Sequence, residues 1–148
     1  FPIGGLITFG PEVSALLTPG QHGTTFGGNP VATAAALATL SAIETDNVMA
    51  NVQATGDFLR EGLRAVEGVT EVRGEGLLIG IDLGPDLEGA APAAVQAALD
   101  AGFIINATGP ATLRLAPPLI LTTDQAATFL DKLSAILQAA AATTIGQS

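Results

Sequence analysis

The segment 69–83, which reads VTEVRGEGLLIGIDL, constrains the fold more than any other part of the chain. It begins with alternating polar and apolar residues, passes through a Gly-Glu-Gly turn at 74–76, and ends in an apolar run. Alternation is typical of a strand with one buried face, and a short apolar run beside turn residues is typical of a buried strand. The segment therefore predicts two strands of a sheet.

Predicted helices flank these strands. Apolar residues recur at near-helical spacing from Val48 to Val66, and Gly68 closes this amphipathic helix. Helices that alternate with strands predict a small α/β domain over 47–148. The remaining elements predicted in this domain are a helix over 92–101, strands over 103–106 and 112–116, and a last helix that opens with a Thr-x-x-Gln capping box at 122–125.

The first 46 residues are predicted to belong to a larger body. Gly4–Phe9 is an apolar run suited to a buried strand, and Pro11–Leu17 suits a brief helical turn. Asn29 is a good N-cap for a helix that begins at Pro30 and runs to about Thr45. Because a lone strand and helix cannot close a core, we expect 1–46 to be the end of another domain.

Charge and composition exclude several classes of function. The 148 residues carry 14 acidic and 5 basic side chains, a formal charge of −9, which disfavours nucleic acid or an anionic membrane as partner. The absence of cysteine excludes a disulfide framework and a thiolate metal site, and a single histidine gives no zinc site. We therefore expect no metal. No apolar run is long enough to span a bilayer, so we expect a soluble protein, and we expect it in the cytoplasm.

The loop 21–29 has the composition of a phosphate-binding loop. It holds His22, two threonines and three glycines. Thr24 and Thr25 offer hydroxyl donors, the glycines allow close approach of an anion to the backbone, and the helix beginning at Pro30 adds a partial positive charge. The alternative is a glycine-rich connection whose threonines bond to their own backbone.

Arg114 is the second candidate site residue. It stands between Leu113 and Leu115 on a predicted strand, so it faces the opposite side of the sheet from both. It is either a solvated or ion-paired arginine, or a planar fork that receives a carboxylate in two hydrogen bonds. The other charged residues are predicted to have structural roles. We expect Arg73 to stabilise the turn and Lys132, the one lysine, to lie on the exposed side of the last helix. The carboxylates of Asp82, Asp86 and Glu88 are expected to be solvated in loops.

Five segments, taken in order, resemble the class III aminotransferases. They are FPIG at the start, LTPG, HGTTFGGNPVA, VRGEGLLIGIDL and LRLAPPLILT, and together they span nearly the whole chain. The resemblance implies an α/β fold, the C-terminal part of a fold-type I transferase that depends on pyridoxal 5'-phosphate (PLP). In that family, 1–46 would be the end of the large PLP-binding domain and 47–148 the small C-terminal α/β domain.

The resemblance also implies roles for the site residues. Family members are homodimers whose active sites lie at the subunit boundary. Thr25, with Thr24 beside it, matches the residue that reaches the cofactor phosphate of the other subunit, and Arg114 matches the arginine that binds the substrate α-carboxylate. The family's catalytic lysine lies just upstream of the FPIG segment. No catalytic residue is therefore expected in this chain, which alone should be inactive.

The substrate is inferred from resemblance only. The motifs LTPG, TTFGGNP and RLAPPLI are most similar to those of family members that move an amino group from N-acetylornithine to 2-oxoglutarate in arginine biosynthesis. Relatives acting on ornithine, succinyldiaminopimelate or 4-aminobutyrate are the alternative. A rival from another class is a non-catalytic α/β module that binds a phosphate-bearing ligand or a partner chain.

Overall fold

The computed structural model describes residues 1–18 and 20–145, and the chain divides into two compact units. The first unit is Phe1–Asp46 and the second begins at Asn47. Among the described residues of the first unit only Ala32 is buried, whereas the second unit contains an extended apolar core. Within the described residues, no helix combines the length and the apolar character that crossing a bilayer requires.

Two helices form the regular structure of the first unit. α1 (Pro11–Ser14) is shorter than predicted, and α2 (Pro30–Thr45) has the predicted bounds. Asn29 is its N-cap, because its Oδ1 accepts a 3.0 Å hydrogen bond from the Ala32 amide. The strand predicted over Gly4–Phe9 is wrong: these residues are exposed and form no strand. A strand needs a neighbour for its backbone hydrogen bonds, and the described residues of this unit offer none.

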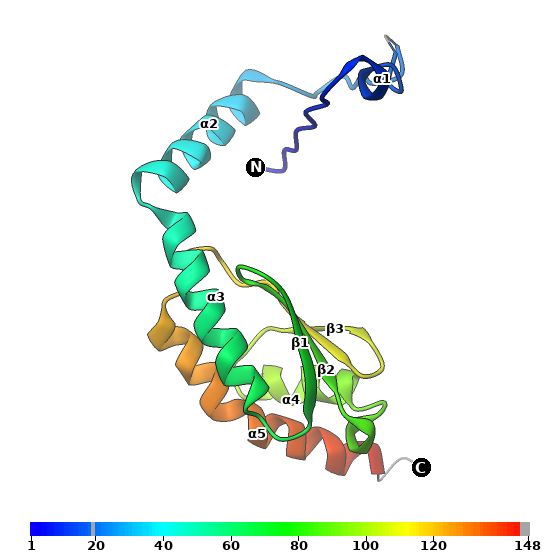
Figure 1. Cartoon of the computed structure of the whole chain (residues 1–148), viewed down its shortest axis with the longest axis vertical. Coiled ribbons are helices and arrows are strands. Elements are labelled where there is room, and N and C mark those ends of the chain that lie inside the picture. Colours follow the sequence, from blue (N-terminus) through cyan, green and yellow to red (C-terminus); the bar gives the residue numbers. More distant parts are fainter. Residues whose placement is uncertain (19, 146–148) are drawn as a thin grey trace. The chain divides into compact units, whose positions relative to one another are not determined.

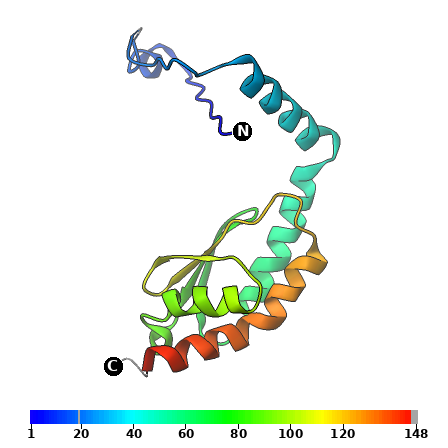
Figure 2. The same cartoon turned by 180° about the vertical axis from the view of Figure 1, so that it is seen from behind.

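The second unit is an antiparallel four-stranded sheet with three helices (Figures 1 and 2). The strand order is β1-β2-β4-β3, so β2 pairs with β1 on one side and with β4 on the other. The elements are α3 (Val48–Arg64), β1 (Val69–Glu75), β2 (Leu78–Leu83), the short 3-10 helix η1 (Pro85–Leu87), α4 (Ala91–Asp100), β3 (Asn106–Gly109), β4 (Thr112–Leu115) and α5 (Thr123–Ile145).

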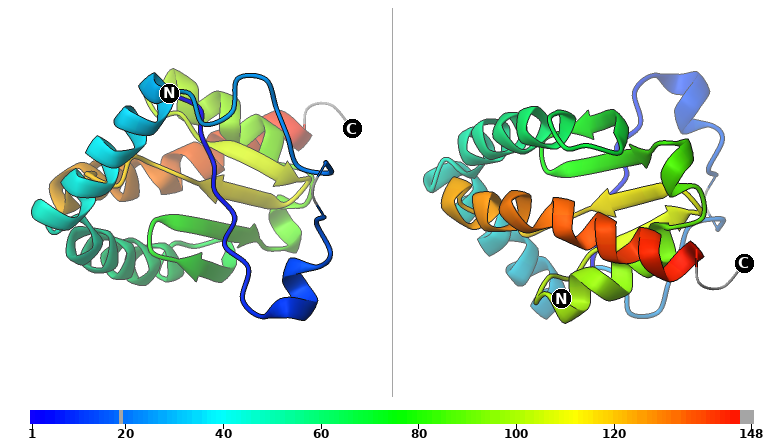
Figure 3. Two further views of the ribbon diagram at one scale, coloured as in Figure 1. Left: turned by 90° about the horizontal axis from the view of Figure 1, so that it is seen from above. Right: turned by 90° about the horizontal axis from the view of Figure 1, so that it is seen from below.

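The helices cover one face of the sheet. Alternate strand residues on that face are buried, among them Ile79, Ile81 and Leu113, each with no exposed surface. The helices contribute Leu59 and Leu63 from α3, and α5 lies between α3 and α4 (Figure 3, right). The opposite face carries polar side chains, as the sequence alternation requires. The sheet thus has one apolar, covered face and one polar, open face.

The β1–β2 hairpin is fixed to α3. Its turn is Gly76-Leu77, slightly later than the predicted Gly-Glu-Gly turn, and Gly76 has a positive φ of 54°. Arg60 of α3 donates from Nη1 to the Gly76 carbonyl over 2.8 Å. The helix comes so near that a Cβ on Gly56 would overlap the Gly76 carbonyl group. A glycine in α3 is therefore required for this close approach.

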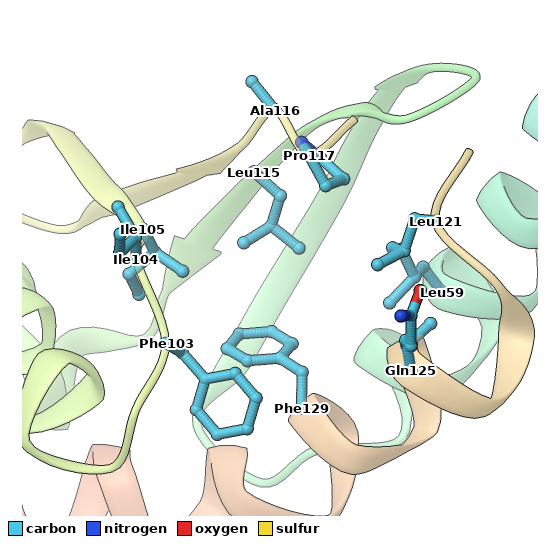
Figure 4. A pocket seen from close by; sticks show the side chains of 11 residues that line it. Leu59, Phe103, Ile104, Ile105, Leu115, Ala116, Pro117, Leu121, Gln125 and Phe129 are labelled. Carbon is cyan, nitrogen blue, oxygen red and sulfur yellow. The ribbon is translucent and has the colours of Figure 1, made fainter. Parts of the chain in front are cut away.

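The strand predicted over Phe103–Asn106 is also displaced. β3 begins only at Asn106, and Phe103 instead packs edge-on against Phe129 of α5, with ring centroids 5.4 Å apart. The three residues before β3 help to line an apolar pocket of about 130 Å³ beneath β4 (Figure 4). Phe103 and Ile105 are half-buried at this pocket, whereas Ile104 is exposed, and none of the three belongs to a strand ladder. An apolar run is therefore not sufficient to identify a strand here.

Local capping signals fix the start of α5. Thr122 donates its amide to Oε1 of Gln125 over 3.1 Å, and the Gln125 amide donates to Oγ1 of Thr122 over 3.2 Å. These reciprocal bonds confirm the predicted capping box. Lys132 lies on this helix and is exposed, as predicted. Asn47, by contrast, precedes α3 in the left-handed region with φ 52° and makes no side-chain cap.

Candidate functional site

Four residues on the open face of the sheet form one cross-strand row. In the register, Gly80 of β2 is aligned with Arg73 of β1 and with Arg114 of β4, and Arg114 is aligned in turn with Asn106 of β3. Gly80 has no side chain, so the row is a pair of arginines on either side of a gap. Arg73, Gly80 and Arg114 line a common groove on this face.

Arg114 is exposed and faces away from the buried Leu113 and Leu115, as predicted. Its Nε donates to Oδ1 of Asn106 over 3.1 Å. Among the described residues no carboxylate lies within ion-pair distance of it. A guanidinium carries five N–H donors, so the bond through Nε leaves the two terminal nitrogens available. The side chain is thus oriented from one edge and can accept a carboxylate on the other.

Arg73 and Asp82 form an ion pair on the same face. Oδ1 of Asp82 also accepts a 2.7 Å hydrogen bond from the Thr112 hydroxyl. The hydrogen bond from Arg73, and next that from Thr112, hold the pKa of the Asp82 carboxyl below its usual value. The predictions that Arg73 stabilises the turn and that Asp82 is a solvated loop carboxylate are therefore wrong, because both belong to strands and bind each other.

The Arg73–Asp82 pair was missed because its formation depends on strand pairing. The alternation in GLLIGIDL places Gly80 and Asp82 on one face of β2, and that signal was present in the sequence. The alignment of β1 with β2 fixes which arginine reaches Asp82, and the turn that sets this alignment was predicted too early. Alternation along β2 alone identifies Asp82 as a residue of the open face, but it does not identify Arg73 as the residue that pairs with it.

Thr24 and Thr25 lie in the first unit, in the loop that leads into α2. Both are exposed, and neither hydroxyl makes a hydrogen bond with the described residues. The loop is tight, because a Cβ on Gly27 would overlap the methyl group of Thr24. Asn29 closes it by donating from Nδ2 to the Phe26 carbonyl over 3.0 Å.

The donor set of this loop fits a phosphate group. Two free hydroxyls and unhindered glycine amides are the donors that a phosphate accepts from. The first amides of α2 contribute less than predicted, since those of Ala32 and Thr33 are bound by Asn29 and Pro30 has no N–H. The loop belongs to the first unit and Arg114 to the second.

Known proteins resemble this chain in sequence and in structure. The family model for class-III aminotransferases matches residues 1–137. The acetylornithine aminotransferase of Mycobacterium leprae is 46% identical over 147 residues, covering 95% of this chain and 34% of that protein. The chain spans about a third of the length of the curated relatives it matches.

Solved structures give the same result. The N-acetylornithine aminotransferase from Stenotrophomonas maltophilia K279a matches with a TM-score of 0.71 and 31% identity, covering 94% of this chain and 35% of that one. The ornithine aminotransferase from Toxoplasma gondii, whose active site holds PLP at partial occupancy, matches with a TM-score of 0.73 and 28% identity over 87% of this chain and 31% of that one. The fold is thus that of part of a PLP-dependent aminotransferase, and the chain belongs to the class-III aminotransferase family.

Proposed function

We propose that this chain supplies the substrate-carboxylate site and part of the cofactor-phosphate site of an aminotransferase that moves an amino group from N-acetylornithine to 2-oxoglutarate. The observation that carries the proposal is Arg114, whose terminal nitrogens are unpaired among the described residues and whose Nε is held by Asn106. The remaining parts of the enzyme would come from the two thirds of the relatives' length that this chain does not span.

Arg114 suits the half of such a reaction that interconverts glutamate and 2-oxoglutarate. In these two molecules the α-carboxylate is bonded to the carbon that loses or receives the amino group, so one guanidinium can orient both of them. The planar fork donates two parallel hydrogen bonds to a carboxylate, which fixes the direction of the substrate as well as its position. Because Asn106 already restrains the Nε edge, less side-chain freedom is lost when a carboxylate binds.

Thr24 and Thr25 are proposed to hold the cofactor. PLP supplies the electron sink that allows an amino group to leave one carbon and join another. The two hydroxyls and the glycine amides of the loop would bind its phosphate, with Thr25 reaching the site of the neighbouring subunit in a homodimer. Lys132 is exposed on α5 and is given no role in the chemistry. The lysine that binds the aldehyde would belong to the upstream part of the enzyme.

The choice of amino donor follows the sequence relatives. The M. leprae relative, at 46% identity, is named for acetylornithine, and we propose the same substrate here, in arginine biosynthesis in the cytoplasm. Ornithine is the second candidate, because the ornithine aminotransferase of T. gondii is as similar to this chain in fold as the N-acetylornithine aminotransferase of S. maltophilia is. Arg114 is proposed to bind glutamate and 2-oxoglutarate, which are common to both reactions, so this site does not distinguish the two donors.

The test uses the complete enzyme in which the lysine-bearing part precedes this chain. We expect Arg114→Lys, which keeps the charge and loses the fork, to lower kcat/KM for glutamate at least tenfold, about 1.4 kcal/mol. Arg64→Lys is the matched control, because Arg64 is an exposed arginine at the end of α3 and does not belong to the row. Wild-type kcat/KM in Arg114→Lys and Arg114→Ala would make Arg114 a structural residue.

A separate variant tests the phosphate loop. Thr25→Ala removes one hydroxyl donor and should weaken PLP retention by about 1–3 kcal/mol, the scale for a hydrogen bond to a charged group. PLP absorbance after dialysis measures retention, and Arg114→Lys should leave it unchanged. Equal retention in Thr25→Ala and wild type would remove Thr25 from the cofactor site.

A further inference from the structure

Asp82 stands at equal register distance from two arginines. It is aligned with Thr112 on β4, and Arg114 is two residues further along that strand on the same face. On the other side, Arg73 is aligned with Gly80, two residues from Asp82 on β2. Such diagonal neighbours in antiparallel sheets have Cα atoms roughly 7–8 Å apart, within reach of an arginine side chain. Either arginine could therefore pair with the Asp82 carboxylate.

Arg73 is the arginine that takes it. The Arg73 side chain lies across Gly80, with its Cγ, Nε and Cζ 3.4, 3.5 and 3.6 Å from where a Cβ on Gly80 would stand. Its Nη1 bonds Oδ2 of Asp82, while Oδ1 is bonded by the Thr112 hydroxyl. Both oxygens of the carboxylate are thus engaged, and Arg114 bonds only the neutral Asn106 among the described residues.

We propose that Arg73 is a positioning residue for carboxylate recognition: by holding Asp82, it keeps the Arg114 guanidinium available for the substrate. The consequence for substrate binding rests on the function proposed above for Arg114, whereas the competition for Asp82 can be measured without substrate. Without Arg73, the acidic Asp82 would retain only the Thr112 hydroxyl and would pair with Arg114, its diagonal neighbour on β4.

A second carboxylate strengthens this competition. Glu71 of β1 is aligned with Asp82 and is exposed on the same face. Like charges directly opposite each other on a sheet are destabilising. Arg73 compensates both carboxylates in the wild-type chain. Its removal would leave two negative charges facing each other, with Arg114 as the nearest cation in the cross-strand row.

The first experiment measures the competition in the chain itself. The Asp82 carboxyl is titrated by carbon NMR in wild type, Arg73→Gln, and Arg73→Gln with Arg114→Gln. If Arg114 takes over the carboxylate, the Asp82 pKa stays lowered in the single variant and rises toward the ordinary aspartate range in the double variant. If the single and double variants titrate alike, Asp82 does not capture Arg114, and the inference is wrong. Arg64→Gln controls for the lost charge.

The second experiment measures whether the competition for Asp82 changes substrate binding. In the complete enzyme, Arg73→Gln should raise KM for glutamate about two- to fivefold, the range expected when an exposed ion pair of this kind must be broken. kcat should change little. Adding Asp82→Asn removes the competing carboxylate and should restore KM. Failure of Asp82→Asn to restore KM would mean that Arg73 acts through the fold of the sheet, which overturns the positioning role.

The two proposals can fail separately. If Arg114→Lys and Arg114→Ala keep wild-type kcat/KM for glutamate, the function proposed for Arg114 is wrong, and the titration alone then judges the Arg73–Asp82–Arg114 competition. If Arg114 proves essential but the Asp82 pKa is the same with and without Arg114, the function stands and the positioning role of Arg73 does not. Should Arg73→Gln fold poorly, Arg73→Lys provides a second variant. Its shorter, unforked cation should hold Asp82 less well and raise KM for glutamate above the wild-type value, and adding Asp82→Asn should again restore KM.

Discussion

Replacing Gly56 by alanine tests the close approach of α3 to the β1–β2 hairpin. An alanine in the interior of a helix is more favourable than a glycine by about 1 kcal/mol, so helix propensity alone predicts a more stable protein. The added Cβ, however, would stand 2.7 Å from the Gly76 carbonyl carbon and still nearer to its oxygen. Backbone atoms of a hairpin turn cannot rotate away, so the whole turn must move.

The magnitude follows from what that movement breaks. Overpacking of this kind costs about 1–3 kcal/mol. If the turn moves, the 2.8 Å bond from Arg60 to the Gly76 carbonyl is weakened, and a hydrogen bond to a charged group is worth about 1.5–3 kcal/mol. If the bond is lost, and after subtracting the propensity gain, we expect Gly56→Ala to lower the free energy of unfolding by about 1.5–5 kcal/mol.

The same helix offers a matched control in Gly62. A Cβ there would overlap Cδ1 of Leu130 and stand 3.2 and 3.3 Å from its Cδ2 and Cγ, and no backbone atom is among these nearest neighbours. A leucine side chain can change rotamer, so Gly62→Ala should stay within about 1 kcal/mol of wild type. Urea denaturation of both variants measures the difference. Equal stabilities of Gly56→Ala and Gly62→Ala would refute the idea that the Gly76 backbone excludes a side chain at residue 56.

Three further predictions concern stability. Phe129→Ala should cost about 3–5 kcal/mol in denaturant unfolding, because Phe129 is 7% exposed and packs on Phe103, whereas Phe58→Ala, at 40% exposed, should cost much less. Thr122→Ala should cost about 1 kcal/mol by removing the capping box of α5, and an unchanged denaturation midpoint would contradict this. The folded-state pKa of Asp82 is lowered, so its ion pair stabilises the protein above the unfolded-state pKa of about 3.9. This stabilisation is lost as pH falls through the folded-state pKa. The difference in denaturation midpoint between wild type and Asp82→Asn should therefore disappear in acid and be constant at neutral pH.

Helix ends could be predicted from the sequence because their signals act within one turn of chain. Asn29 and Pro30 start α2 at the predicted position, and the Thr122–Gln125 pair caps α5 as its spacing requires. These residues bond to amides at most three positions away. Such contacts are set by local sequence and need no knowledge of the rest of the fold.

Strands were predicted less well because a strand is defined by its neighbour. The apolar runs at Gly4–Phe9 and from Phe103 both resemble strands, yet neither has a partner among the described residues before Asn106. The pairing of β2 with β4 joins residues thirty or more positions apart and has no local signal. The orientation of Arg114 could be predicted from alternation within its own strand, but its relation to Arg73 required that pairing. The roles of Thr24 and Thr25 remain predictions.

The exposure of Arg114 on the open face of the sheet affects how strongly a carboxylate would bind there, but not the direction in which it would bind. Two unit charges 4 Å apart attract by about 1 kcal/mol in bulk water and by about 4 kcal/mol at an effective dielectric constant of 20. Arg114 is exposed in this chain, so a carboxylate bound there would be weakly held and screened by salt. An element that covered this face in the complete enzyme would exclude water and strengthen the attraction. We expect the strands to set the direction in which a carboxylate binds, and the affinity to depend on how well the site is shielded from water.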